Sequence, residues 1–159
     1  MVTLKAVRED NVWPLLRLKV AENQRDFVAT NTQSIVEAYC ALAAGETAMP
    51  YGIYDGVTPV GFLMLGYGKM PGDAERKDAP NAYSLWRFMI DERYQRKGLG
   101  REALKQALAL IRAKPCGPAD VCFLSYEPEN TVAKELYHSF GFRENGLMED
   151  EEIIAALRL

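Results

Sequence analysis

The residues best suited to chemistry stand in one short segment, Gln95–Arg101, with the sequence QRKGLGR. Glycines allow backbone N–H groups to approach a ligand closely, and Arg96, Lys97 and Arg101 add positive charge. The segment precedes an amphipathic stretch that predicts a helix, whose first N–H groups lack partners and carry the positive end of the dipole. It therefore predicts an anion-binding loop suited to a pyrophosphate; a glycine turn with a solvated basic edge is the structural alternative.

Two other phosphate-binding motifs compete with this interpretation. The P-loop pattern G-x-x-x-x-G-K-[ST] does not occur in the chain. Gly98, Gly100 and Ala103 satisfy the dinucleotide pattern G-x-G-x-x-G/A, and Asp120 follows about twenty residues later. Asp120 precedes the next expected strand instead of ending it, however, and a hairpin precedes the glycines. This context argues against a nicotinamide or flavin site.

The first half of the chain predicts a strand, two helices and a hairpin. Alternation of apolar and polar residues predicts a strand at residues 2–6, and helical spacing predicts helices over 10–20 and 31–44. Asp10 is the expected N-cap of the first helix, and Asn31 or Thr32 that of the second. Asp55-Gly56 joins two strands, Tyr51–Tyr54 and Val60–Tyr67, as a tight antiparallel turn.

The second half predicts alternating strands and helices after a polar loop at residues 69–81. Strands are expected at 83–91 and 121–126, separated by a helix that begins at Gly98 and followed by one that Asn130 opens. Two further strands are expected within 142–159. The strand-helix-strand run is long enough for a right-handed parallel crossover, so we expect a mixed sheet and the class α/β or α+β.

Composition narrows the function classes. At 159 residues the chain predicts one domain, 1–159, against a prior of roughly 150 residues per domain. The net charge of −3 argues against binding nucleic acid or an anionic membrane. The N-terminus lacks a secretory pattern, and the three cysteines form no C-x-x-C pair, so we expect a cytoplasmic protein with no metal site.

Two sequence blocks resemble a known family. The segment Phe88–Gly100, FMIDERYQRKGLG, closely resembles the acetyl-CoA loop of GCN5-related N-acetyltransferases (GNAT), whose pattern is Q/R-x-x-G-x-G/A. A second block follows in the family's order: Asn130–Tyr137, NTVAKELY, and then Phe140-Gly141-Phe142. The resemblance extends over most of the chain, and the nearest subgroup is the bacterial spermine/spermidine N-acetyltransferases.

The resemblance implies the GNAT acyl-CoA N-acyltransferase fold, with a mixed central sheet splayed between strands 4 and 5, about four flanking helices and acetyl-CoA in the opening. It also implies that the backbone of Phe88, Met89 and Ile90 binds the pantetheine arm, which Asn130 contacts as well. The pyrophosphate would be held by main-chain donors of the loop residues Gln95, Arg96, Lys97, Gly98, Leu99, Gly100 and Arg101.

Tyr137 matches the family's general acid, which protonates the departing thiolate. A phenol with an ordinary pKa near 10 suits a thiolate of similar basicity. Periodicity by itself offers the alternative that Tyr137 is the edge of an apolar helix face, since Val132, Ala133, Leu136 and Phe140 already explain the helix.

The acceptor amine must lose its proton before it attacks, because an alkylammonium has no lone pair. Where the polyamine subgroup tends to have an acidic residue, two positions before Phe88, this chain has Trp86, which can hold an ammonium by cation–π attraction. Acidic candidates for the acceptor side are Glu22, Glu92, Glu149 and Asp150, each with the alternative of a solvated charge or loop salt bridge. The only histidine, His138, points about 100° away from Tyr137 around the helix and is expected on the surface.

The function that we expect is transfer of acetyl from acetyl-CoA to a primary amine of a small molecule, with spermine and spermidine as leading acceptors, by direct transfer in a ternary complex. Alternative acceptors are a protein N-terminus, an amino acid or an aminoglycoside. A non-catalytic acyl-CoA-binding sensor is the alternative from another class. Many relatives dimerise, so the resemblance also allows a homodimer.

Overall fold

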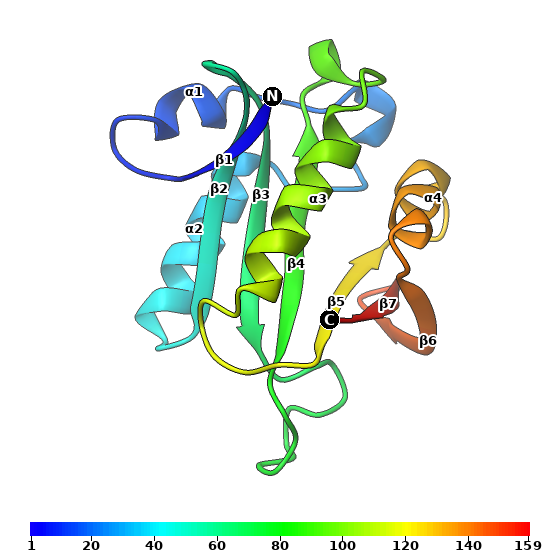
Figure 1. The fold of residues 1–159 in the computed structure, drawn as a ribbon. Helices are drawn as coiled ribbons and strands as arrows, with labels where there is room; N and C mark the ends of the chain where they lie inside the picture. Colours follow the sequence, from blue (N-terminus) through cyan, green and yellow to red (C-terminus); the bar gives the residue numbers. More distant parts are fainter.

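The computed structural model describes residues 1–159 and contains one open seven-stranded sheet with the order β1-β2-β3-β4-β5-β7-β6 (Figure 1). All neighbouring strands are antiparallel except β4 and β5, which are parallel. The predicted mixed sheet and crossover are therefore confirmed. The strands are β1 (Val2–Ala6), β2 (Thr47–Asp55), β3 (Thr58–Gly68), β4 (Ala82–Ile90), β5 (Val121–Tyr126), β6 (Arg143–Glu149) and β7 (Glu152–Arg158).

Four α-helices cover the sheet in two layers. They are α1 (Val12–Leu16), α2 (Asn31–Ala43), α3 (Leu99–Arg112) and α4 (Thr131–Ser139), with short 3₁₀ turns at Glu22–Gln24 and Glu92–Tyr94. The apolar stripe of α3 and the inner side of α4 share one buried cluster with the sheet, and α1 and α2 pack into a second cluster (Figure 1). No helix has the length and apolar character that a membrane crossing requires.

The N-terminal helices differ from the prediction at their starts and in the length of the first. Asn11, not Asp10, stands at the N-cap of α1, where its side chain accepts from Arg8 N at 2.7 Å. That helix ends at Leu16, four residues earlier than expected, and the N–H of Lys19 is bound by the carboxylate of Asp91. Thr30 caps α2, since its hydroxyl accepts from Gln33 N at 3.1 Å; the expected caps Asn31 and Thr32 are already inside the helix.

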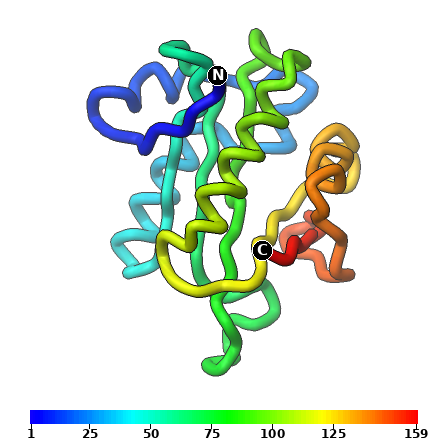
Figure 2. The backbone as a smooth tube through the Cα atoms, in the orientation of Figure 1, coloured from blue at the N-terminus to red at the C-terminus, as the bar shows by residue number.

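The parallel pairing between β4 and β5 is very short, and it sets the point at which the two strands separate. It consists of Tyr83 with Cys122 and Ser84 with Phe123, after which the strands diverge (Figure 2). Just beyond, β4 contains a bulge, because Leu85 and Arg87 oppose adjacent residues of β3 and Trp86 is the extra residue. A bulge bends and twists its strand locally. The splay expected between the fourth and fifth strands is therefore present.

Candidate active site

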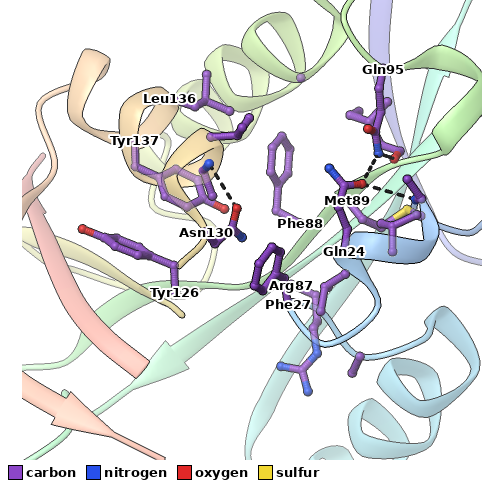
Figure 3. A pocket seen from close by; sticks show the side chains of 18 of the residues that line it. Gln24, Phe27, Arg87, Phe88, Met89, Gln95, Tyr126, Asn130, Leu136 and Tyr137 are labelled. Carbon is purple, nitrogen blue, oxygen red and sulfur yellow. Dashed lines mark hydrogen bonds between the residues drawn. The ribbon is translucent and has the colours of Figure 1, made fainter. Parts of the chain in front are cut away.

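The opening between β4 and β5 holds a cavity of about 540 Å³. Its walls are β4, the end of β5, one side of α4, the start of α3 with the loop before it, the first residue of β7 and the segment 20–29 that connects α1 to α2 (Figure 3). Of the residues predicted for the site, nine line it: Trp86, Phe88, Met89, Ile90, Gln95, Arg96, Gly100, Asn130 and Tyr137. Residues more than forty positions apart in sequence thus meet at one opening.

The loop Gln95–Arg101, predicted to bind an anion, has the backbone conformation that its sequence predicts. Arg96 and Gly98 both have positive φ values, 60° and 78°, and Gly98 is the N-cap of α3 without a side-chain capping bond. The first N–H groups of this helix are therefore free to meet an anion, at the positive end of the dipole. A Cβ on Gly98 would meet nothing within 4 Å, so its left-handed backbone is the reason for glycine there.

The charged side chains of this loop are not equivalent. Arg96 lines the cavity, whereas Lys97 Nζ donates to the carbonyl of Arg93 at 3.0 Å. Arg101 donates to Ser139 Oγ at 2.8 Å and lies over the ring of Phe140. Lys97, Gly98, Leu99 and Arg101 do not line the cavity.

Gln95 has a structural role for its side chain. Its amide donates to the carbonyl of Ile90 at 2.9 Å and to the side chain of Gln24 at 2.8 Å (Figure 3). These bonds fasten the loop to the end of β4 and to the α1–α2 connection. The conformation of the anion-binding loop is thereby tied to the segment that forms the opposite wall of the cavity.

The edge of β4 that faces β5 is open from residue 85 onward, because the two strands pair only at residues 83 and 84. Phe88 is partly buried and faces the cavity, while the side chain of Met89 is buried in the cluster beneath α1 and α2 (Figure 3). Backbone polar groups on such an edge require partners. An extended molecule with amide groups would supply them by running along β4.

Asn130 is placed by its capping bond. It is the N-cap of α4, and its side-chain oxygen accepts from Ala133 N at 3.3 Å. The amide nitrogen of the same side chain has no protein partner and remains a donor at the cavity wall (Figure 3).

Tyr137 lies on the cavity wall formed by α4, within a group of aromatic rings (Figure 3). Its ring centroid is 5.9 Å from that of Tyr126 and 6.0 Å from that of Phe142, and the residue is only 7% exposed. Burial, and then the negative charge of Glu152, raise the pKa of the Tyr137 hydroxyl well above its usual range. A phenol is protonated at neutral pH with or without this shift, as a proton donor must be, but the raised pKa makes Tyr137 a weaker acid than the ordinary phenol assumed from the sequence.

The acidic candidates divide into those near the cavity and those outside it. Glu22 pairs with Arg25 at 2.7 Å, and Glu92 pairs with Lys19 at 3.4 Å. Neither lines the cavity, and Glu92 forms a loop salt bridge, the alternative offered from the sequence. Sequence reasoning did not select Asp26 and Glu152 individually, although both line the cavity. Glu152 belongs to the acidic run Glu149–Glu152, whereas nothing in the sequence marks Asp26.

Two further residues of the cavity, Tyr126 and Arg87, donate hydrogen bonds to carboxylates that lie outside its lining. Tyr126 donates to Glu144 at 2.9 Å, and burial together with this carboxylate raises its pKa to about 12. His138 Nε2 lies 3.9 Å from the same carboxylate, partly exposed as expected and outside the cavity lining. The guanidinium of Arg87 donates to Glu37 at 2.5 Å, so the cation beside Trp86 is already neutralised.

A second cavity, of about 650 Å³, adjoins the first. It is lined by residues 84–87 of β4, residues 123–125 of β5, Glu37 and Glu46, the start of the 69–81 loop and the turn between β6 and β7. Glu149 and Asp150, which the sequence offered as acceptor-side acids, line this second cavity and not the first.

Comparison with known proteins adds three findings. A model of the acetyltransferase (GNAT) family matches residues 16–142. The chain is 34% identical, over 91% of its own length and 90% of the relative, to a spermine/spermidine N(1)-acetyltransferase of Bacillus subtilis. It is 30% identical, over 64% of its length and 59% of the relative, to the N-alpha-acetyltransferase RimI of Mycobacterium tuberculosis.

Solved structures share the fold. An aminoglycoside acetyltransferase in complex with coenzyme A superposes with a TM-score of 0.77 at 18% identity, over 99% of this chain and 95% of the other. At that identity the likeness shows a shared fold and nothing more.

Proposed function

Because this chain belongs to the GNAT family of N-acetyltransferases, we propose that it moves an acetyl group from acetyl-CoA to a primary amine of a polyamine such as spermine or spermidine. The observation that carries the choice of acceptor is the 34% identity to a spermine/spermidine acetyltransferase over nine-tenths of both chains. The carboxylates of Asp26 and Glu152 at the cavity support it, since a polyamine is a polycation at neutral pH.

The residues of the cavity fit acetyl-CoA as a co-substrate. The uncapped start of α3 and the Arg96 side chain suit the pyrophosphate, and the free edge of β4 at Phe88–Ile90 suits the amide groups of the pantetheine arm. The free amide nitrogen of Asn130 is a further donor for that arm. In this arrangement acetyl-CoA would extend from the start of α3, along β4, to the aromatic rings around Tyr137.

The reaction is a direct transfer. The lone pair of the neutral amine attacks the thioester carbonyl carbon, a C–N bond forms, the C–S bond breaks, and the sulfur leaves with its electron pair. Tyr137 gives its phenolic proton to that sulfur, the acceptor nitrogen releases its own proton to solvent, and a proton from solvent restores the Tyr137 hydroxyl. Holding both substrates in one cavity removes most of the entropic cost of their encounter.

Calorimetry with acetyl-CoA, with NAD as control ligand, tests the co-substrate first. Release of coenzyme A thiol is then followed with spermine, spermidine, an aminoglycoside and a short peptide with a free N-terminus. We expect binding of acetyl-CoA alone and a kcat/KM for the polyamines well above that for the other amines.

Each contrary result identifies what fails. Turnover of the aminoglycoside or the peptide in preference to polyamines overturns the acceptor. Binding of acetyl-CoA without turnover of any amine leaves a non-catalytic acyl-CoA-binding protein. Absence of acetyl-CoA binding overturns the function assigned to the loop at Gln95–Arg101.

A further inference from the structure

Glu152 occupies the junction of the two cavities. Five residues line both: Leu85, Trp86, Arg87, Ser125 and Glu152. Glu152 is the only carboxylate among them. Glu152 is therefore the acidic side chain that borders both cavities.

The backbone fixes the position of Glu152 tightly. It is the first residue of β7 and pairs with Glu149 across a turn in which Asp150 and Glu151 both have positive φ values, 48° and 67°. The hydroxyl of Ser125, on the neighbouring strand β5, donates a hydrogen bond to its carboxylate. The side chain is thus held toward the splayed end of β5 and away from the exposed tip of the turn.

The charge of this carboxylate is not neutralised by a cation. Its one hydrogen-bond donor is the neutral hydroxyl of Ser125. After the effect of burial, Glu152 is the largest contributor to the raised pKa values of Tyr137 and Glu127. Its negative field therefore extends to the hydroxyl expected to protonate the leaving sulfur.

The second cavity continues the same electrostatic character. Its lining carries the carboxylates of Glu37, Glu46, Glu149, Asp150 and Glu152 against two cations, Lys69 and Arg87. Arg87 is paired with Glu37, and the ammonium of Lys69 donates to the carbonyl of Ala79. Glu46, Glu149 and Asp150 form no salt bridge within the protein, so their negative charges are available to a cationic ligand.

We propose that Glu152 binds the ammonium group next to the reacting nitrogen of a linear, multiply charged amine, and that the remainder of this acceptor extends into the second cavity. The inference rests on the proposed function and deepens it, because it makes length and charge spacing the basis of acceptor choice. Trp86, at the same junction, offers its ring to the methylene chain or to the ammonium.

A pair of matched substitutions tests this role. Glu152→Gln removes the charge while keeping the shape, and Glu151→Gln removes an equal charge from the adjacent position, which is exposed and lines neither cavity. We expect Glu152→Gln to raise the KM for spermine about tenfold to a hundredfold, in line with loss of a charge-assisted contact, with a much smaller change in kcat. Glu151→Gln is expected to match the wild type.

Acceptor length supplies the second arm. A simple alkyl monoamine has no second ammonium, so its KM is expected to be high and nearly equal in the wild type and in Glu152→Gln. The pair Glu149→Gln with Asp150→Asn is expected to raise the KM for spermine and leave that for the monoamine unchanged. Calorimetry with acetyl-CoA is expected to give the same Kd for all variants, and thermal unfolding checks that each one folds.

The outcomes separate this inference from the proposed function. Polyamine turnover by the wild type with equal spermine KM values in Glu152→Gln and Glu151→Gln overturns the inference and leaves the function standing. A loss confined to kcat also overturns it, because Glu152 then acts in proton transfer instead of binding. A wild type that acetylates other amines but no polyamine overturns the function, and the inference with it.

Discussion

The rings of Phe88 and Tyr137 face each other across the splayed sheet, with centroids 6.4 Å apart. Phe88 belongs to β4 and Tyr137 to α4, so the pair spans the two halves of the molecule where the proposed acetyl transfer takes place (Figure 3). Burial raises the pKa of the Tyr137 hydroxyl above its usual range.

Tyr137→Phe is expected to lower kcat by about 10²–10⁴-fold, the usual contribution of a general acid. The Kd for acetyl-CoA should change little, because the ring and its packing remain. Steady-state kinetics and calorimetry give the two values. Tyr39→Phe, at an exposed position on α2, is the control, and a Tyr137→Phe enzyme with wild-type kcat would remove Tyr137 from the mechanism.

Arg96→Gln is expected to raise the Kd for acetyl-CoA about fivefold, since one charged contact to the pyrophosphate is lost. The matched change Lys97→Gln should have a smaller effect, because the Lys97 ammonium is directed to the carbonyl of Arg93. The wild-type affinity should weaken with added salt, and that of Arg96→Gln less steeply. Equal Kd values for the two variants would contradict the geometry described for the loop.

Asp91→Asn is expected to destabilise the fold by about 1–3 kcal/mol at neutral pH, the range for a buried charged hydrogen-bond acceptor. Burial alone would raise the pKa of Asp91, but hydrogen bonds from Arg93 and from the N–H of Lys19 hold it below its ordinary value. Its carboxylate therefore stabilises the fold fully above the unfolded pKa of about 3.9, and this is lost as the pH falls through the lower folded value.

Urea unfolding between pH 7 and pH 2.5 measures this dependence. The difference in unfolding free energy between the wild type and Asp91→Asn should narrow as the pH falls below about 4. A constant difference over this range would mean that the ionised form of Asp91 is not what stabilises the loop.

Glu37→Gln is expected to destabilise the protein by about 1–3 kcal/mol, because it leaves the Arg87 cation without its carboxylate. Arg87 is mostly buried, and its Nε already has no hydrogen-bond partner. Chemical denaturation gives the difference. The double variant Glu37→Gln with Arg87→Met should recover part of the loss, and an additive double variant would contradict a direct interaction.

The sequence by itself determined the features that rest on local order along the chain. The turn at the start of α3 is one, since Gly98 adopts positive φ immediately before an apolar helical stripe. The Asp55-Gly56 hairpin, the helix that Asn130 caps and the parallel crossover are others. The resemblance to the acetyltransferase family on two blocks is likewise confirmed.

Only the tertiary structure decided how these parts meet. Sequence placed three basic side chains beside the loop, but long-range contacts direct Arg101 to Ser139 on α4 and leave Arg96 at the cavity. Glu92 pairs with Lys19, which lies far earlier in the sequence, in the connection between α1 and α2. Glu152 reaches the junction of the cavities because β5 and β7 pair in a register that brings Ser125 within hydrogen-bonding reach. The register of distant strands sets these neighbours, and no local pattern encodes it.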